Sequence, residues 1–373
     1  MGLVSVAPRI DILIPVFRES ALLESLLERL LKDTYKPKDI IVTIDEPTER
    51  SLNLVNRMKG QVKFILNSER MGKAAALNRA VKDLRGGILL FLDSDVKLKD
   101  YSRGFLKVLV EEMNGADLLD IRKGVIRRNF LSRLISYDYL IINMINWFYS
   151  KSRRSLGLNG SAFAIRRKIF EKLGGFRGVI SEDLDLGMRC LLKECSFKYT
   201  DKIEVLNDVP NTWREWYTQR KRWSIGTLLW LQAYSFDILK NLMKHPIFAL
   251  PFLLIFAPSI VSITLYSLTY DALYGVASIL LLPFSPVLIG VALLMHGGVE
   301  LLMHGTIAML LSITGFGIST SIFKVISKKT RYLYSFGEYP AFYFIYAPIL
   351  FGVALISFLQ LVLRYESDIQ WKI

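Results

Sequence analysis

The sequence ILLFLDSD, residues 88–95, decides the fold, because five apolar residues are followed directly by two carboxylates. A short apolar run bounded by polar turn residues indicates a buried strand. Similar runs occur at Ile10–Val16, Ile40–Ile44 and Val62–Leu66, and segments with helical periodicity separate them. Strands that alternate with helices at this spacing predict an α/β fold with a mainly parallel sheet, covered on both faces.

In a parallel α/β sheet, ligands bind beyond the carboxyl ends of the strands. Asp45 follows the second predicted strand, and Asp93 and Asp95 follow the fourth. Two carboxylates two residues apart on a tight turn can both reach one hard cation, such as Mg²⁺ or Mn²⁺. Aspartate is also common in ordinary turns, so this pair needs support from other motifs.

Three more charged residues stand at the starts of predicted helices. Glu182 and Asp183 begin a helix that runs through Cys190, where they either serve catalysis or simply face the positive end of the helix dipole. Lys73 follows Gly72 at the start of an alanine-rich helix. Its side chain either reaches a phosphate group or lies on the surface.

The pentapeptide QRKRW, residues 219–223, is the most distinctive motif of the chain. In a helix, Gln219, Arg222 and Trp223 share one face. A planar guanidinium pairs with two oxygens of a diphosphate at once, and an indole ring suits the apolar face of a sugar. The alternative is a basic amphipathic helix on a membrane surface, with the tryptophan at the level of the lipid headgroups.

The composition indicates a protein that is partly embedded in a membrane. Of its 373 residues 52% are hydrophobic, and the mean hydropathy is +0.32. The net charge is +14, and nearly all of this excess lies before His245. A basic soluble part suits anionic lipid or a phosphorylated substrate, and no nucleic-acid motif is present to favour a nucleic-acid partner. Cys190 and Cys195 are expected to be reduced thiols, and no signal peptide is expected.

The chain after residue 245 contains the predicted membrane region. Residues 246–268, 271–295 and 339–363 are apolar and long enough to cross a hydrocarbon core of about 30 Å. A glycine-interrupted apolar segment lies at 297–322, and a basic loop is expected at 323–338. Positive residues in short loops favour the cytoplasm, where the catalytic domain is also expected. The chain must then cross the membrane an even number of times between the catalytic domain and this loop. We therefore expect 297–322 to form an interface or re-entrant helix, and the alternative is four full spans.

Two helical segments leave alternatives open. The aromatic segment Arg127–Arg154 has basic residues at both ends, and it is either a core helix or an interfacial one. His296, Glu300 and His304 follow one another at intervals of four residues. This stripe favours a solvated or interfacial helix face over a zinc site.

Together, the motifs resemble those of the processive membrane glycosyltransferases of family 2, which include the cellulose, chitin and hyaluronan synthases. In chain order the matching motifs are Ile14-Pro15-Val16-Phe17, Asp45, Gly72-Lys73-Ala74, Asp93-Ser94-Asp95, Glu182-Asp183 and Gln219-x-x-Arg222-Trp223. The segment Phe323–Lys328 is similar to the gating-loop motif Phe-x-Val-Thr-x-Lys, with Ile326 in place of Thr. Arg18, where the family often has Asn, and Asp45-Glu46-Pro47, in place of Asp-Asp-Gly, depart from the pattern.

This resemblance implies a family A glycosyltransferase-like domain at residues 1–230, with amphipathic interface helices, and a transmembrane region at 231–373. It implies a metal-dependent, inverting hexosyltransferase in the cell membrane, multi-pass, with its catalytic domain in the cytoplasm. The donor would be a nucleotide-diphosphate sugar, a UDP-sugar first, and the product a growing polysaccharide. The alternatives are transfer of a single sugar to a polyprenyl phosphate or other lipid acceptor, and an inactive subunit that binds a glycan or scaffolds a complex. The chain is also compatible with a homo-oligomer.

The resemblance also implies a role for each motif residue. Asp183, beside Glu182, would act as the general base, and Trp223 would form the floor of the acceptor site. Asp95 and Asp93 would hold Mg²⁺ or Mn²⁺ against the diphosphate. The remaining residues would bind the donor: Asp45 its base, Lys73 its ribose or phosphates, Gln219 and Arg222 its diphosphate, with Lys328 contributing from the gating-like loop.

Overall fold

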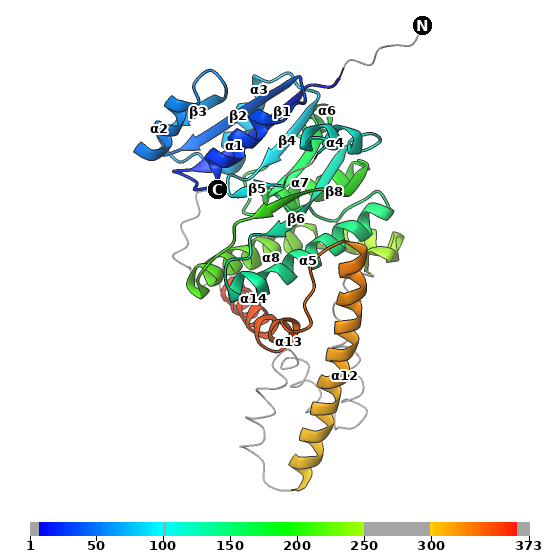
Figure 1. Cartoon of the computed structure of the whole chain (residues 1–373). Coiled ribbons are helices and arrows are strands. Elements are labelled where there is room, and N and C mark those ends of the chain that lie inside the picture. Colours follow the sequence, from blue (N-terminus) through cyan, green and yellow to red (C-terminus); the bar gives the residue numbers. More distant parts are fainter. Residues whose placement is uncertain (1–6, 100–101, 250–298, 364–373) are drawn as a thin grey trace. The chain divides into compact units, whose positions relative to one another are not determined.

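The computed structural model describes residues 7–99, 102–249 and 299–363 (Figure 1). These residues belong to two compact units, of which the first extends to Ser235 and the second begins at Phe236. The first unit contains the sheet and the helices that cover it. The described part of the second unit is helical.

An eight-stranded mixed sheet forms the centre of the first unit, in the order β3-β2-β1-β4-β7-β6-β8-β5. The strands are β1 (Ile10–Phe17), β2 (Lys38–Asp45), β3 (Lys63–Asn67), β4 (Ile88–Leu92), β5 (Val96–Leu98), β6 (Leu118–Val125), β7 (Ala162–Arg166) and β8 (Phe197–Asn207). The first four strands are parallel to one another, and β6 is parallel to β8. Strand β7 runs antiparallel to both β4 and β6, and β5 runs antiparallel to β8.

The four strands predicted from the sequence are all present, with ends that differ by at most two residues. The helices of the first unit are α1 (Leu23–Lys32), α2 (Glu49–Arg57), α3 (Lys73–Lys82), α4 (Phe105–Glu112), α5 (Phe130–Lys151), α6 (Arg167–Lys172) and α7 (Glu182–Leu192). Helix α8 (Trp213–Lys244) begins in the first unit and continues into the second. The predicted mainly parallel α/β sheet is therefore confirmed, and the antiparallel β7 is its main irregularity.

Both faces of the sheet are covered, as the apolar strands require. Ile10, Ile12 and Ile14 of β1 belong to a buried cluster that also contains the apolar faces of α1 and α4. On the opposite face, aromatic rings pack together from β4, β7, α6 and the segment that follows it: Phe91, Phe163, Phe170 and Phe176. Burial on both sides explains why these strands read as continuous apolar runs.

Helix α5 packs against β6 and β8, and thirteen of its residues are buried. Its start is a capping box, in which Asn129 and Ser132 each satisfy a backbone N–H of the other. The burial of Leu134, Ile135 and Leu140 supports the core-helix alternative for this segment over the interfacial one. The basic residues at its ends flank a helix that covers the sheet.

In the second unit, α12 (Val299–Lys329) is followed by α13 (Tyr339–Ala341), a π-helical turn (Phe342–Tyr346) and α14 (Ala347–Val362). Within the described residues, one helical stretch, Tyr339–Val362, is long and apolar enough by length and composition to cross a membrane. It coincides with the predicted span 339–363. The predicted spans 246–268 and 271–295, and His296 of the polar stripe, lie outside the described residues, except for the short 3₁₀ helix Pro246–Ala249.

The structure corrects the expected boundary between the helix 297–322 and the loop 323–338. Helix α12 continues to Lys329, so the gating-like segment Phe323–Lys328 is helical. Two physical reasons favour this extension. The segment contains neither Gly nor Pro, and Lys328 and Lys329 lie in the last turn, where the helix dipole favours positive charge. The loop begins after the helix, where Arg331 adopts a positive φ of 52°.

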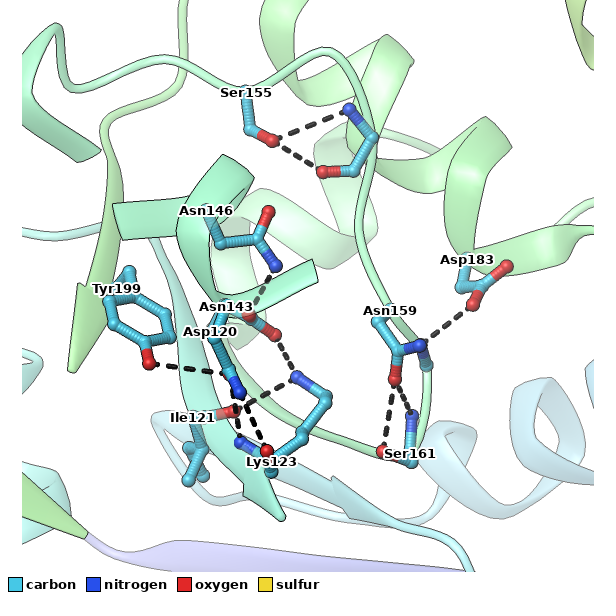
Figure 2. A network of polar contacts seen from close by, with 12 residues as sticks. Asp120, Ile121, Lys123, Asn143, Asn146, Ser155, Asn159, Ser161, Asp183 and Tyr199 are labelled. Atoms are coloured by element: carbon cyan, nitrogen blue, oxygen red, sulfur yellow. Dashed lines mark hydrogen bonds and ion pairs between the residues drawn. The ribbon is translucent and has the colours of Figure 1, made fainter. Parts of the chain in front are cut away.

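A fully buried ion pair lies within β6 and is hydrogen-bonded to α5 (Figure 2). Lys123 donates to Asp120, and both side chains are shielded completely from solvent. Asn146 of α5 donates to the other Asp120 oxygen at 2.7 Å, and Asn143 exchanges two hydrogen bonds with the backbone of Lys123. Burial raises the pKa of Asp120, and the neighbouring Lys123 acts in the opposite direction.

We expect Lys123→Met to lower the free energy of unfolding by about 3 to 5 kcal/mol, because it leaves the buried Asp120 without its counter-ion. Denaturant titration of the purified protein measures this loss. The control is Lys107→Met on the exposed side of α4, which should change stability by less than about 0.5 kcal/mol. Equal effects of the two substitutions would contradict an energetic role for the buried pair.

Candidate active site

A small pocket opens beyond the carboxyl ends of β1 and β4, where the sequence placed the ligand site. Its lining comes from segments far apart in the chain: Pro15, Lys73, Leu77, Phe91, Leu92, Asp93, Gly160, Phe163, Phe176, Glu182 and Asp183. The pocket thus combines the start of α3, the end of β4 and the start of α7. Three of the predicted motifs meet here.

Lys73 lies at the centre of this group. Its Nζ is 2.7 Å from Oδ1 of Asp93 and 3.3 Å from Oε1 of Glu182. Burial by itself lowers the pKa of Lys73, but the Asp93 and Glu182 carboxylates outweigh burial and raise it above its usual value. The side chain is therefore a permanent cation between two acidic motifs. Its side chain is 35% exposed, and the predicted contact with a phosphate group stays a prediction.

Asp183 is held in place by backbone donors (Figure 2). The N–H of Gly160 donates to its Oδ2 at 2.7 Å, which is the dashed line at Asp183 in Figure 2. The N–H of Leu184 donates to its Oδ1 at 2.8 Å. A side chain at Gly160 would not fit, because its Cβ would lie 2.9 Å from Oδ2 of Asp183. Burial, and then the adjacent Glu182, raise the pKa of Asp183 to about 6. This carboxylate is ionised near neutral pH and basic enough to accept a proton.

The turn with Asp93 and Asp95 is tied to three other segments. The N–H of Asp93 donates to the carbonyl of Ser161 at 2.9 Å, and the hydroxyl of Ser20 donates to the carbonyl of Ser94 at 2.7 Å. The carbonyl of Asp95 accepts from the N–H of Asp208 at 2.8 Å. These bonds hold the turn in one conformation, so the two carboxylates are presented by a rigid support.

The donor set of this turn fits a hard divalent cation. Two causes raise the pKa of Asp95 to about 7: desolvation of its carboxylate is the larger, and the charge of the nearby Asp93 is the smaller. Part of the residue nevertheless remains exposed. The part of this shift that comes from Asp93 is a repulsion between two carboxylates, which a bound cation would relieve. Across the described part of the chain, no cluster of three or more His, Cys, Asp or Glu residues could enclose a metal ion. Two carboxylates suit a cation whose other ligands are water and phosphate oxygens.

Asp45 is buried and holds the loop before α3. Its Oδ2 accepts from the N–H groups of Met71 and Gly72 at 3.0 and 2.9 Å, and its Oδ1 accepts from the Asn67 amide at 2.8 Å. Both carboxylate oxygens are therefore engaged within the protein. The predicted contact with the nucleotide base stays a prediction, whereas the bonds that set the start of α3, and with it Lys73, are direct observations.

The QRKRW motif lies on α8 as predicted, and its side chains differ in exposure. Arg222 is exposed, Trp223 and Gln219 are half-buried, and Arg220 is almost completely buried. Gly226, one turn further on, faces the segment before α7. A Cβ there would lie 2.1 Å from the hydroxyl oxygen of Ser181. This close approach brings the helix with the motif against the helix with the acids.

Sequence reasoning missed Arg220 and its partner Asp138. The Nη2 of Arg220 donates to Oδ2 of Asp138 at 2.8 Å, and its guanidinium stacks on the Trp223 ring, 4.1 Å from the ring centroid. A signal was present, because Asp138 is the sole acidic residue in the aromatic segment Arg127–Arg154. Lys328, in the last turn of α12, belongs to the second unit, and its part in donor binding stays a prediction.

Comparison with known proteins identifies the class. Residues 88–297, more than half of the chain, match the model of the family described as glycosyl transferase family group 2, so the protein belongs to this family.

Individual curated proteins resemble this chain over part of their length. The probable glycosyltransferase YdaM of Bacillus subtilis (strain 168) is 26% identical over 259 residues, which cover 65% of this chain and 61% of YdaM. Glucomannan 4-beta-mannosyltransferase 2 of Arabidopsis thaliana is 23% identical over 54% of this chain and 41% of its own length. The chain thus spans less than two thirds of the length of these curated relatives.

A solved structure shares the fold. The mannosyltransferase PcManGT from Pyrobaculum calidifontis, in complex with GDP-Man and Mn²⁺, superposes with a TM-score of 0.54 at 14% identity, and the match covers 97% of this chain and 89% of PcManGT. This likeness confirms the family A glycosyltransferase-like fold, with helices after the sheet domain and an apolar C-terminal helix.

We expect Asp45→Asn to lower the free energy of unfolding by about 1 to 3 kcal/mol, because the amide weakens the bonds to two buried N–H groups. Thermal or denaturant unfolding measures the change, with Asp83→Asn on the exposed end of α3 as the control. If Asp45→Asn matched the parent in stability and lost only nucleotide affinity, the carboxylate would serve the nucleotide and not the loop.

Proposed function

We propose that this glycosyltransferase is a membrane-integrated, inverting enzyme that transfers a sugar from a nucleotide-diphosphate sugar to a growing polysaccharide. The observation that carries the proposal is the position of Asp183, a raised-pKa carboxylate held by backbone donors beside the Lys73–Asp93–Glu182 cluster. A general base next to a charged site for a diphosphate is the arrangement that a single in-line displacement requires.

In the proposed reaction, Asp183 accepts the proton of the acceptor hydroxyl. As an acceptor hydroxyl oxygen forms its bond to the anomeric carbon, Asp183 takes the hydroxyl proton, and the bond to the diphosphate oxygen breaks with its electron pair on that oxygen. Because the hydroxyl attacks from the side opposite the leaving diphosphate, the configuration at the anomeric carbon is inverted. The nucleoside diphosphate leaves as an anion. Lys73, whose Nζ is 2.7 Å from Asp93, supplies positive charge at this site.

The remaining motif residues bind and orient the substrates. Asp93 and Asp95 would hold Mg²⁺ or Mn²⁺, which neutralises charge on the leaving diphosphate. The exposed guanidinium of Arg222 and the amide of Gln219 bind diphosphate oxygens, and Lys328 contributes from the second unit. Trp223 supplies an apolar surface on which the acceptor sugar rests.

The nucleotide and the acceptor are inferred from chemistry and from the relatives. UDP-sugars are the first donors to test, and GDP-mannose joins them because PcManGT was solved with GDP-Man and another relative is named a mannosyltransferase. Trp223 favours a glycan acceptor, since a lipid phosphate needs no stacking surface. Transfer of one sugar to a polyprenyl phosphate is the second candidate, and it is supported by the apolar stretch Tyr339–Val362, which suits work at a bilayer.

The decisive experiment incubates the full chain in detergent with a panel of UDP- and GDP-sugars and Mn²⁺, and measures the released nucleoside diphosphate and the product length. We expect release from one donor, a product of many sugars, and loss of both signals with EDTA. Asp183→Asn preserves the size of the side chain and should lower the transfer rate at least about a hundredfold, while nucleotide binding persists.

Each outcome has a separate meaning. Activity that survives chelation would overturn the divalent-cation assignment. Products with a single added sugar would replace the polymerase by the single-sugar enzyme. Full activity of Asp183→Asn would remove the general base on which the proposal rests.

The pH dependence of transfer follows from the same residue. Asp183 acts as a base only when ionised, and its raised pKa of about 6 places the loss of the base in the mildly acidic range. We expect the transfer rate to be level above this pKa and to fall about tenfold for each pH unit below it. Lys73 and Glu182 are the charged groups that face Asp183, and Lys73, with its raised pKa, stays protonated throughout. A rate that is constant through this range would contradict the assignment.

A further inference from the structure

Arg220 is the buried member of the QRKRW motif, and its burial requires an explanation. The residue is 2% exposed, and a guanidinium cannot lose its charge, so a partner must compensate it. Asp138 of α5 supplies that partner through the 2.8 Å bond to Nη2. Because α5 is packed against the sheet, Arg220 is anchored to the rigid core of the first unit.

The anchored guanidinium contacts two side chains that the proposed function uses. It lies 4.1 Å from the centroid of the Trp223 ring and covers one face of the indole, so a sugar can stack only on the opposite face. Its Nη1 donates to Oε1 of Gln219 at 3.0 Å. A guanidinium is a donor only, so this bond fixes which end of the amide is the oxygen and leaves the amide NH₂ group to face an anion.

The residue after Asp138 senses both the Arg220–Asp138 pair and the acidic turn. Tyr139, the next residue of α5, is buried, and burial raises its pKa. The charges that act on Tyr139 are those of Arg220, Asp95, Asp138 and Asp93. This short segment of α5 is therefore within electrostatic range of both the QRKRW motif and the acidic turn.

From this geometry we infer that Arg220, held by Asp138, is a positioning residue that sets the Trp223 ring for the acceptor and the Gln219 amide for the diphosphate. The inference rests on the proposed function, because that function assigns Trp223 and Gln219 their ligands. The competing explanation is that the pair merely fastens α8 to α5.

The chain offers a matched control for mere fastening. Arg189 of α7 is buried to a similar degree, and its Nε donates at 2.7 Å to Asp185 of the same helix. Asp185 also accepts from the Tyr234 hydroxyl of α8 at 2.6 Å, so this pair fastens α7 to α8. In each pair, Arg→Lys keeps the charge and removes the planar fork. The set comprises the parent, Arg220→Lys, Arg189→Lys, Trp223→Ala and the Arg220→Lys/Trp223→Ala double variant, all as full chains in detergent. The readouts are the thermal midpoint and kcat and KM for mannotetraose and cellotetraose with the donor that the parent uses.

We expect Arg220→Lys to raise the KM for the oligosaccharide acceptor about fivefold to tenfold, because the planar guanidinium that stacks on the Trp223 ring is lost, with a smaller change in kcat. Arg189→Lys should lower the thermal midpoint comparably and leave that KM unchanged. In the Trp223→Ala background, Arg220→Lys should add nothing to the acceptor KM, because the two residues act through one surface. An unchanged KM for Arg220→Lys, or fully additive effects, would overturn the inference.

A second readout does not depend on transfer. The fluorescence of Trp223, obtained as the difference between each protein and its Trp223→Phe counterpart, is titrated with the neutral quencher acrylamide. We expect Arg220→Lys to increase quenching of this signal and Arg189→Lys to leave it unchanged. If the parent transfers no sugar yet quenching rises as expected, the proposed function fails and the positioning of the ring stands. If quenching does not change, Arg220 does not hold the ring.

Discussion

The ion pairs of Lys73 with Asp93 and Glu182 are the interaction on which the site depends. Four acidic residues converge at the carboxyl ends of β1 and β4, and like charges at this distance repel one another. Lys73 offsets that repulsion from the first residue of α3. One ammonium group thereby joins three segments that are remote in sequence. Burial and the neighbouring acids still raise the pKa values of Asp183 and Asp95 to about 6 and 7, against the lowering effect of Lys73.

The supports around this cluster are short-range and steric. Asp45 binds the backbone before α3, so it sets the position from which Lys73 reaches the acids. Gly160 and Gly226 permit close approach where any side chain would collide, with Asp183 in one case and with Ser181 in the other. The acids are therefore held by packing and by backbone donors, which costs little reorganisation when a charged substrate binds.

The parallel half of the sheet was readable from local patterns, and the other half was not. Strands β1 to β4 are apolar runs separated by amphipathic helices, and this alternation has few solutions. Strands β6 and β8 contain buried polar residues such as Asp120, Lys123 and Thr200, whose partners come from other elements, so their sequences lack the apolar signal. The end of α12 was misplaced for a different reason: the basic residues after the apolar segment indicated a loop, whereas lysines are also favoured in the last turn of a helix.

By itself, the sequence determined the fold class and the motifs, because period and residue type are local properties of the chain. It also marked Arg18 as a departure from the family, and the structure shows the physical basis: a φ of 62°, a region that Asn adopts more readily than Arg. Only the tertiary structure decided that Lys73 bridges two acidic motifs, that Asp45 faces backbone donors, and that Arg220 lies between Asp138 and Trp223. Except for the local contact between Arg220 and Trp223, these are contacts between residues tens of positions apart, and their geometry is set by how α3, α5, α7 and α8 pack on the sheet.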